Sequence, residues 1–139
     1  MRPRLLLLSL CLFAAASTAF AQPATYVVNP SRVQFTASSD HAVVLPDGTP
    51  MVSRYELRVY VQGAPEPVTT TDLGKPAPVA GDITTDITSV LGSLPLSATV
   101  QYVARVVAVG QTGVGVSDPS NPFGHVGSPA TPQNARVSR

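Results

Sequence analysis

Residues 99–109 read TVQYVARVVAV, and this stretch decides the fold. Its side chains alternate with a period of two, which is typical of a β-strand, in which successive side chains point to opposite faces. The row expected to face the core contains Val100, Tyr102, Ala104, Val106 and Ala108. The row expected to face outward contains Gln101, Val103, Arg105, Val107 and Val109. The alternation therefore predicts a strand over residues 99–109.

The same alternation occurs in RYELRVYVQ, residues 54–62. Its apolar row contains Tyr55, Leu57, Val59 and Val61. Tyr60 is the single aromatic residue in the opposite, polar row. Shorter stretches of β-prone residues predict three further strands, at 32–37, 82–88 and 114–118, and Tyr26-Val27-Val28 in the lead-in is a candidate first edge strand.

Proline and glycine separate these stretches and predict loops between short elements. Residues 38–50 are expected to be a loop with a turn at Pro46-Asp47-Gly48. Residues 63–81 are rich in Pro, Thr and Gly, and we expect them to be irregular apart from a short edge strand at 68–71. No window shows a sustained helical period. The pattern predicts an all-β sandwich or barrel.

The N-terminus has the features of a secretory signal peptide. Arg2 and Arg4 precede a nearly continuous apolar run over residues 5–16, and Ala19-Phe20-Ala21 places small residues at a cleavage site. We expect residues 1–21 to be removed and the mature chain to begin at Gln22. The product would then be secreted, in a periplasmic or extracellular location.

A membrane span and a lipid anchor both fit this segment less well than a signal peptide does. A transmembrane anchor needs about 20 apolar residues, and Ser17-Thr18 ends the run too early. A lipid anchor on Cys11 would need a small residue in place of Leu10. We therefore expect no membrane span after cleavage.

The composition of the mature chain excludes several classes of protein. Cleavage removes Arg2 and Arg4, so nine basic residues become seven, against eight acidic ones. Such a balance offers no basic field for nucleic acid or anionic lipid. The only cysteine, Cys11, lies in the signal, which argues against cysteine catalysis and cysteine-bound metal. The remaining 118 of 139 residues suffice for one hydrophobic core.

The segment LSATVQYVARVVAV, residues 96–109, resembles the corner and following strand of a fibronectin type III domain. Leu96 precedes Tyr102 by six residues, as in that family, and alternating apolar residues follow. Residues 55–60 (YELRVY) are similar to the third strand of the family, and residues 113–122 to its last strand. The resemblance covers about residues 30–123.

The resemblance implies a fibronectin type III or immunoglobulin-like β-sandwich of about seven antiparallel strands. It implies that Tyr102 is a tyrosine corner, with its ring buried under Leu96 and its hydroxyl bonded to the backbone. The expected organisation is a lead-in at 22–31, the domain at 32–123 and a flexible tail at 124–139. The chain departs from the family in having no Trp, and in having Ser97-Ala98 where the corner usually has Pro-Gly.

Candidate catalytic and metal-binding residues are few. His41 and His125 lie in expected loops, and Ser39-Asp40-His41 are neighbours in sequence, whereas a catalytic triad is assembled from separate elements. No G-x-S-x-G motif occurs. Asp47-Gly48 supplies only one of the several carboxylates of a calcium loop. We expect neither an enzyme nor a cofactor or metal.

The outward face of the two strong strands is the best candidate for an interaction surface. If they are neighbours, the outward rows bring together Arg58, Tyr60, Val103, Arg105, Val107 and Val109. Aromatic residues and Arg are enriched in protein interfaces, although β-propensity alone also places valines on exposed faces.

These features favour a non-catalytic binding or adhesion module whose partner is another protein or domain. One alternative is a structural or accessory spacer domain with no ligand of its own. A more distant alternative is a small secreted hydrolase or a carbohydrate-associated module.

Overall fold

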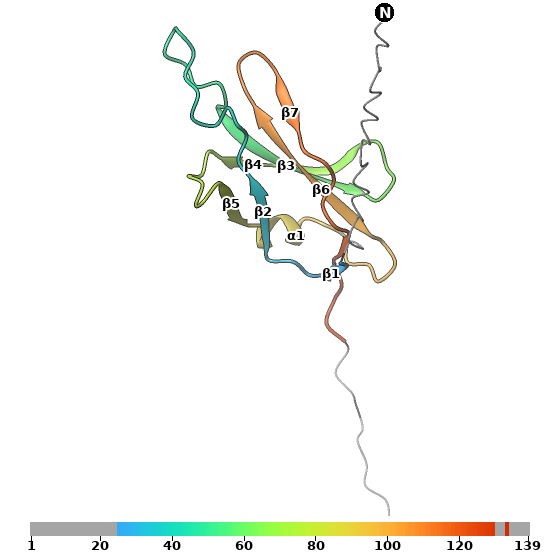
Figure 1. The fold of residues 1–139 in the computed structure, drawn as a ribbon. Helices are drawn as coiled ribbons and strands as arrows, with labels where there is room; N and C mark the ends of the chain where they lie inside the picture. Colours follow the sequence, from blue (N-terminus) through green and yellow to red (C-terminus); the bar gives the residue numbers. More distant parts are fainter. Residues whose placement is uncertain (1–24, 130–132, 134–139) are drawn as a thin grey trace, which may run out of the picture.

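The computed structural model describes residues 25–129 and residue 133 (Figure 1). The expected signal peptide, residues 1–21, lies outside the described residues. The described chain is mostly β-strand with one short helix, which confirms the all-β class. Its elements are β1 (Val27–Val28), β2 (Arg32–Thr36), β3 (Arg54–Val61), β4 (Pro67–Gly74), β5 (Asp82–Asp86), α1 (Thr88–Gly92), β6 (Tyr102–Val109), β7 (Val114–Val116) and β8 (Phe123–Gly124). No helix within these residues is long and apolar enough to cross a membrane.

The strands form two sheets. The larger has the order β1-β8-β6-β3-β4, with β7 also paired to β6, and the smaller consists of β2 and β5. The expectation of about seven antiparallel strands is met in part, because the described residues contain eight strands and their pairings are antiparallel except that β1 pairs with β8 in parallel. Asn29 takes a left-handed conformation with φ of 46° just before Pro30, and this turns the chain out of one sheet and into the other.

The core lies between the two sheets. The alternation of β3 and β6 is observed as expected, since Tyr55, Leu57 and Val59 are buried opposite the inner row of β6. The smaller sheet contributes Ile83 and the ring of Phe35, whose centroid lies 5.1 Å from that of Tyr55. Burial of these apolar side chains is the main stabilising contribution.

Several element boundaries differ from the sequence-based expectation. The edge strand expected at 68–71 is longer, because β4 runs from Pro67 to Gly74 along the border of the sheet, where Pro67 needs no partner for its nitrogen. The strand expected at 82–88 ends at Asp86. Helix α1 follows and buries Val90 and Leu91.

Both ends of the domain extend beyond the expected boundaries. The lead-in at 22–31 contains β1, which joins the larger sheet. The tail was expected to begin at 124, but Gly124 belongs to β8. The side chain of Asn29 then accepts a hydrogen bond from the backbone N–H of Val126 at 2.9 Å and donates one to its carbonyl at 3.0 Å. The chain is therefore held in place at least as far as Val126.

The corner before β6 is built around Tyr102. Its side chain is buried, and its hydroxyl donates a hydrogen bond to the carbonyl of Pro95 at 3.3 Å. The ring centroid lies 5.8 Å from that of Phe123. The expectation that Leu96 covers the ring is wrong, because Leu96 is 64% exposed whereas Leu94 is buried. Pro95 separates the two leucines, and only the first of them enters the core.

We predict that Tyr102→Phe lowers the free energy of unfolding by about 1–3 kcal/mol, because the carbonyl of Pro95 loses its donor. Tyr102→Leu also loses the ring packing, so its loss should be larger, toward about 3–5 kcal/mol. Tyr60→Phe is the matched control on the opposite face of the larger sheet and should change stability by less than about 0.5 kcal/mol. Urea unfolding of the three variants measures these differences. Equal losses for Tyr60→Phe and Tyr102→Phe would contradict the assignment of the two faces.

Candidate functional site

The candidate interaction residues come from two neighbouring strands of the larger sheet. Strand β3 pairs with β6 in antiparallel register over its whole length. On the face turned away from the core, the register pairs are Arg54 with Val109, Glu56 with Val107, Arg58 with Arg105, and Tyr60 with Val103. The structure therefore brings all six sequence-predicted surface residues onto one face of β3 and β6.

Val107 does not contribute to an accessible surface, which corrects the sequence-based expectation. It points away from the main core but has an exposure of 0%. Strands pair on both sides of it, placing Glu56 of β3 and Val116 of β7 at its flanks. The short valine side chain is enclosed because a strand is paired on each side of it. The accessible part of the face is narrower than the sequence suggested.

Arg58 is engaged in an ion-pair network on this face. The carboxylate of Glu56 accepts hydrogen bonds from Arg54 at 2.7 Å and from Arg58 at 3.0 Å. Arg54 also lies 3.7 Å from a carboxylate oxygen of Asp72 on β4. The bonds from Arg54 and then Arg58 lower the pKa of Glu56, and the bond to Glu56 raises the pKa of Arg58. The positive charge of Arg58 is thus largely compensated.

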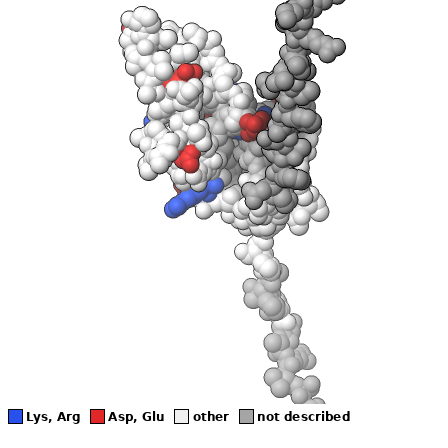
Figure 2. Space-filling model, viewed as in Figure 1, with Lys and Arg blue, Asp and Glu red and all other residues white. Residues whose placement is uncertain are grey.

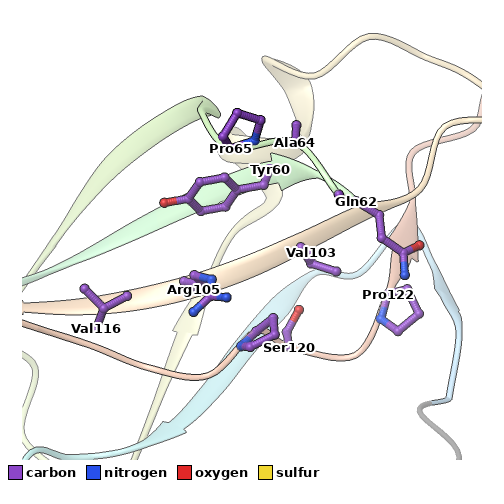
Figure 3. A pocket seen from close by; sticks show the side chains of 11 residues that line it. Tyr60, Gln62, Ala64, Pro65, Val103, Arg105, Val116, Ser120 and Pro122 are labelled. Atoms are coloured by element: carbon purple, nitrogen blue, oxygen red, sulfur yellow. The ribbon is translucent and has the colours of Figure 1, made fainter.

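A groove of about 670 Å³ opens on the same face, and we call it the binding groove (Figure 3). Tyr60, Val103 and Arg105, three of the predicted residues, line it. Pro65 of the β3–β4 hairpin lies on one side of it, and Pro119 and Pro122 of the segment after β7 also line it. Val109 does not line the groove. The groove is mostly apolar, with one guanidinium group inside.

The segment after β7 is held by two consecutive Ser-x-Pro units, Ser117-Asp118-Pro119 and Ser120-Asn121-Pro122. The N–H of Ser117 donates to the carbonyl of Val106 at 2.9 Å, and its hydroxyl accepts from the N–H of Val106 at 3.0 Å. Ser120 makes the same two contacts with Ala104, at 2.8 and 2.9 Å. Each serine therefore takes the position that a residue of a paired strand would occupy. The two prolines have no N–H to donate, but Val106 and Ala104 of β6 still have hydrogen-bond partners in the serines.

Sequence reasoning did not predict that the Ser-x-Pro segment borders the groove. The signal was present as the repeat Ser-Asp-Pro-Ser-Asn-Pro, whose period of three differs from the period of two that marks a strand. Arg105 is held against the same segment, because its guanidinium donates to the carbonyl of Ser117 at 3.0 Å. The side chain of Arg105 also lines the groove, and its guanidinium has further N–H groups beyond the one bonded to Ser117.

The two histidines have structural contacts away from the groove. Nδ1 of His41 lies 3.0 Å from the hydroxyl of Tyr55, which also accepts a bond from the N–H of Ser38 at 3.1 Å. Nδ1 of His125 lies 3.0 Å from the carbonyl of Leu94 and donates to it. Each histidine therefore ties a loop to the core.

Metal binding finds no support in the part of the chain that the structure describes. No group of three or more His, Cys, Asp or Glu residues is close enough there to hold an ion.

No protein-family model matches the chain, and no curated protein matches it either. The binding groove is thus the feature on which a functional proposal rests.

We predict that Glu56→Gln lowers stability at neutral pH by about 0.5–1 kcal/mol, toward the upper part of the range for surface ion pairs. Because folding lowers the pKa of Glu56, its contribution is present above the unfolded-state pKa of about 4.3 and is lost as pH falls through the lower folded-state pKa. The difference between the variant and the unaltered protein should therefore shrink at acid pH.

The measurement is thermal unfolding at several pH values, with Glu66→Gln as the control. Glu66 is an exposed glutamate just before β4. Glu66→Gln should leave the melting temperature nearly unchanged at every pH. If Glu56→Gln had the same small effect as Glu66→Gln at neutral pH, the ion-pair network would not stabilise this face.

Proposed function

We propose that this chain is an exported, non-catalytic binding module with a fibronectin type III-like sandwich, and that it binds another protein through the binding groove. The pairing order β4-β3-β6-β7 beside a separate β2-β5 pair supports this type of sandwich. The bond from Tyr102 to Pro95 also fits the corner of that family. The signal-like residues 1–21 support export to a periplasmic or extracellular location.

The observation that carries the proposal is the joint placement of Tyr60 and Arg105 in a groove with proline walls. Tyrosine and arginine are among the residue types that most often dominate the energy of protein interfaces. Both Ser-x-Pro units are fixed to β6 by backbone and hydroxyl bonds, so one wall is already ordered before binding. An ordered wall reduces the entropy lost on association.

The chemistry of the groove indicates what kind of segment it accepts. Tyr60 and Val103 offer an apolar surface, and Arg105 keeps guanidinium donors beyond the one bonded to Ser117. A partner segment with an apolar side chain next to a carboxylate or carbonyl group satisfies both. Ser120 is the only serine among the lining residues of the groove. Its hydroxyl donates a hydrogen bond to the carbonyl of Asn121 at 2.8 Å.

Binding fits this groove better than hydrolysis. Its lining residues include no His, Cys, Asp or Glu, and therefore no general base beside a nucleophile. The guanidinium of Arg105 and the hydroxyl of Tyr60 can both donate hydrogen bonds, which suits recognition of acceptor groups on a partner.

We predict that a photo-crosslinking amino acid in place of Tyr60 captures one defined partner in the exported fraction. The same amino acid in place of Ser89, an exposed residue of helix α1, is the position control and should capture far less. Arg105→Glu combined with the label at Tyr60 should reduce capture at least about tenfold, the effect of losing roughly 1.4 kcal/mol of binding energy. Mass spectrometry identifies the adduct. Equal labelling at the two positions would favour a spacer domain instead.

A further inference from the structure

Strand β2 has a regular and open edge. It pairs only with β5 among the described residues, in uniform register from Arg32 opposite Asp86 to Thr36 opposite Asp82. The bonds from Ile87 N–H to the Ser31 carbonyl and from Ala37 N–H to the Gly81 carbonyl show that odd-numbered residues of this strand bond to β5. Even-numbered residues alternate with them, so their backbone groups point to the open edge. Figure 1 shows β2 in front of the larger sheet.

The core is incompletely covered beside this edge. The inward side chains of β2, Val33 and Phe35, are only half-buried, whereas Tyr55, Leu57 and Val59 of β3 are buried. A second groove of about 360 Å³ separates β2 from β6 and β7, and Phe35, Tyr55 and Val116 are among its lining residues. An added strand at the β2 edge would cover part of this apolar surface.

The open edges of β4 and β7 carry features that hinder strand pairing, but β2 does not. Strand β4 contains Pro67, and its register with β3 shifts at two points. Strand β7 has only three residues. Bulges, proline and short length are the usual protections of edge strands. The register of β2 with β5 has no such shift, and Pro30 lies before the strand begins.

We propose that a second copy of this chain pairs with β2 in antiparallel orientation, with a two-fold axis at Gln34. The open-edge groups of Arg32, Gln34 and Thr36 then form hydrogen-bonded pairs with those of Thr36, Gln34 and Arg32 in the second copy. The two small sheets join as β5-β2-β2-β5. Such an interface is isologous, because the same strand contributes on both sides.

The charges on the outer side of β2 fit this register. Gln34 and Thr36 each donate a side-chain hydrogen bond at 2.9 Å to the carboxylate of Asp82. Arg32 faces Thr36 of the second copy, so its guanidinium approaches Asp82 of the second copy on the next strand. No like charges face each other, and Gln34 meets Gln34 at the axis. Figure 2 shows that the face seen there is mostly uncharged, with separated acidic and basic groups.

The inward side chains of β2 also fit the proposed antiparallel register. In the same register, Val33 lies opposite Phe35 of the second copy, in the non-hydrogen-bonded pairs whose side chains are closest. Aromatic and β-branched residues pair favourably across strands. The binding groove lies on the outer face of the larger sheet, away from β2, so a dimer would present two such grooves.

The test is sedimentation equilibrium of the protein, expressed as the whole chain and purified as the cell processes it. Over ~1 µM to 1 mM, the range of moderate affinities, it should convert from monomer to dimer. Gln34→Lys and Gln34→Glu each place like charges at the axis, so each should weaken dimerisation at least about tenfold. Thr70→Lys, on the exposed side of the β4 edge strand, is the matched control and should dimerise like the unaltered protein.

An equimolar mixture of Gln34→Lys and Gln34→Glu completes the test. The opposite charges then face each other, so the mixture should recover the dimer mass that each variant alone has lost. Recovery also shows that both variants are folded. A monomeric unaltered protein over the whole concentration range would overturn the proposal. So would a Gln34→Lys variant that dimerises as strongly as the unaltered protein, or a mixture that stays monomeric.

Discussion

The rest of the structure depends on the antiparallel pairing of β3 with β6. The register joins Leu57 to Val106 and Val59 to Ala104 on the inner side, and Tyr60 to Val103 on the outer side. Because side chains alternate along a strand, this single register decides which residues form the core and which form the groove. The smaller sheet then covers the inner face, and the hairpin after β3 and the Ser-x-Pro units border the outer one.

Sequence periodicity predicted the two long strands and their faces, because a period of two sustained over residues 54–62 and 99–109 is seldom met outside a β-strand. The observed strands are shorter, since β3 ends at Val61 and β6 begins at Tyr102. Periodicity did not predict the burial of Val107, since that depends on a third strand, β7, pairing beside it. It also shortened β4 at both ends, because Pro67, Asp72 and Gly74 are residue types that are depleted in strands, although a proline is tolerated at an edge. Side-chain hydroxyls took the place of backbone partners at Ser117 and Ser120, where no propensity rule applies.

The Tyr102 corner shows how far a resemblance extends. The six-residue spacing from Leu96 pointed to the tyrosine whose hydroxyl bonds back to the backbone, and the bond to Pro95 is present. The leucine of the same spacing is nevertheless exposed, and Leu94 fills the core instead. Spacing along the chain fixes where a backbone group lies, but packing around Pro95 decides which neighbouring side chain is buried.

The register of β3 with β6 can be measured directly by nuclear magnetic resonance. Leu57 and Val106 form a non-hydrogen-bonded pair, since Gln62 and Gln101 form a hydrogen-bonded one and the two kinds alternate. Their Cα atoms should then lie about 4.5 Å apart, which brings the two α-protons close enough for a strong nuclear Overhauser cross-peak. The structure predicts that cross-peak, together with one between the α-protons of Val59 and Ala104. A cross-peak from Leu57 to the α-proton of Arg105 or Val107 instead would indicate a register that differs by one residue. In that register the groove residues would face the core, which would contradict the account.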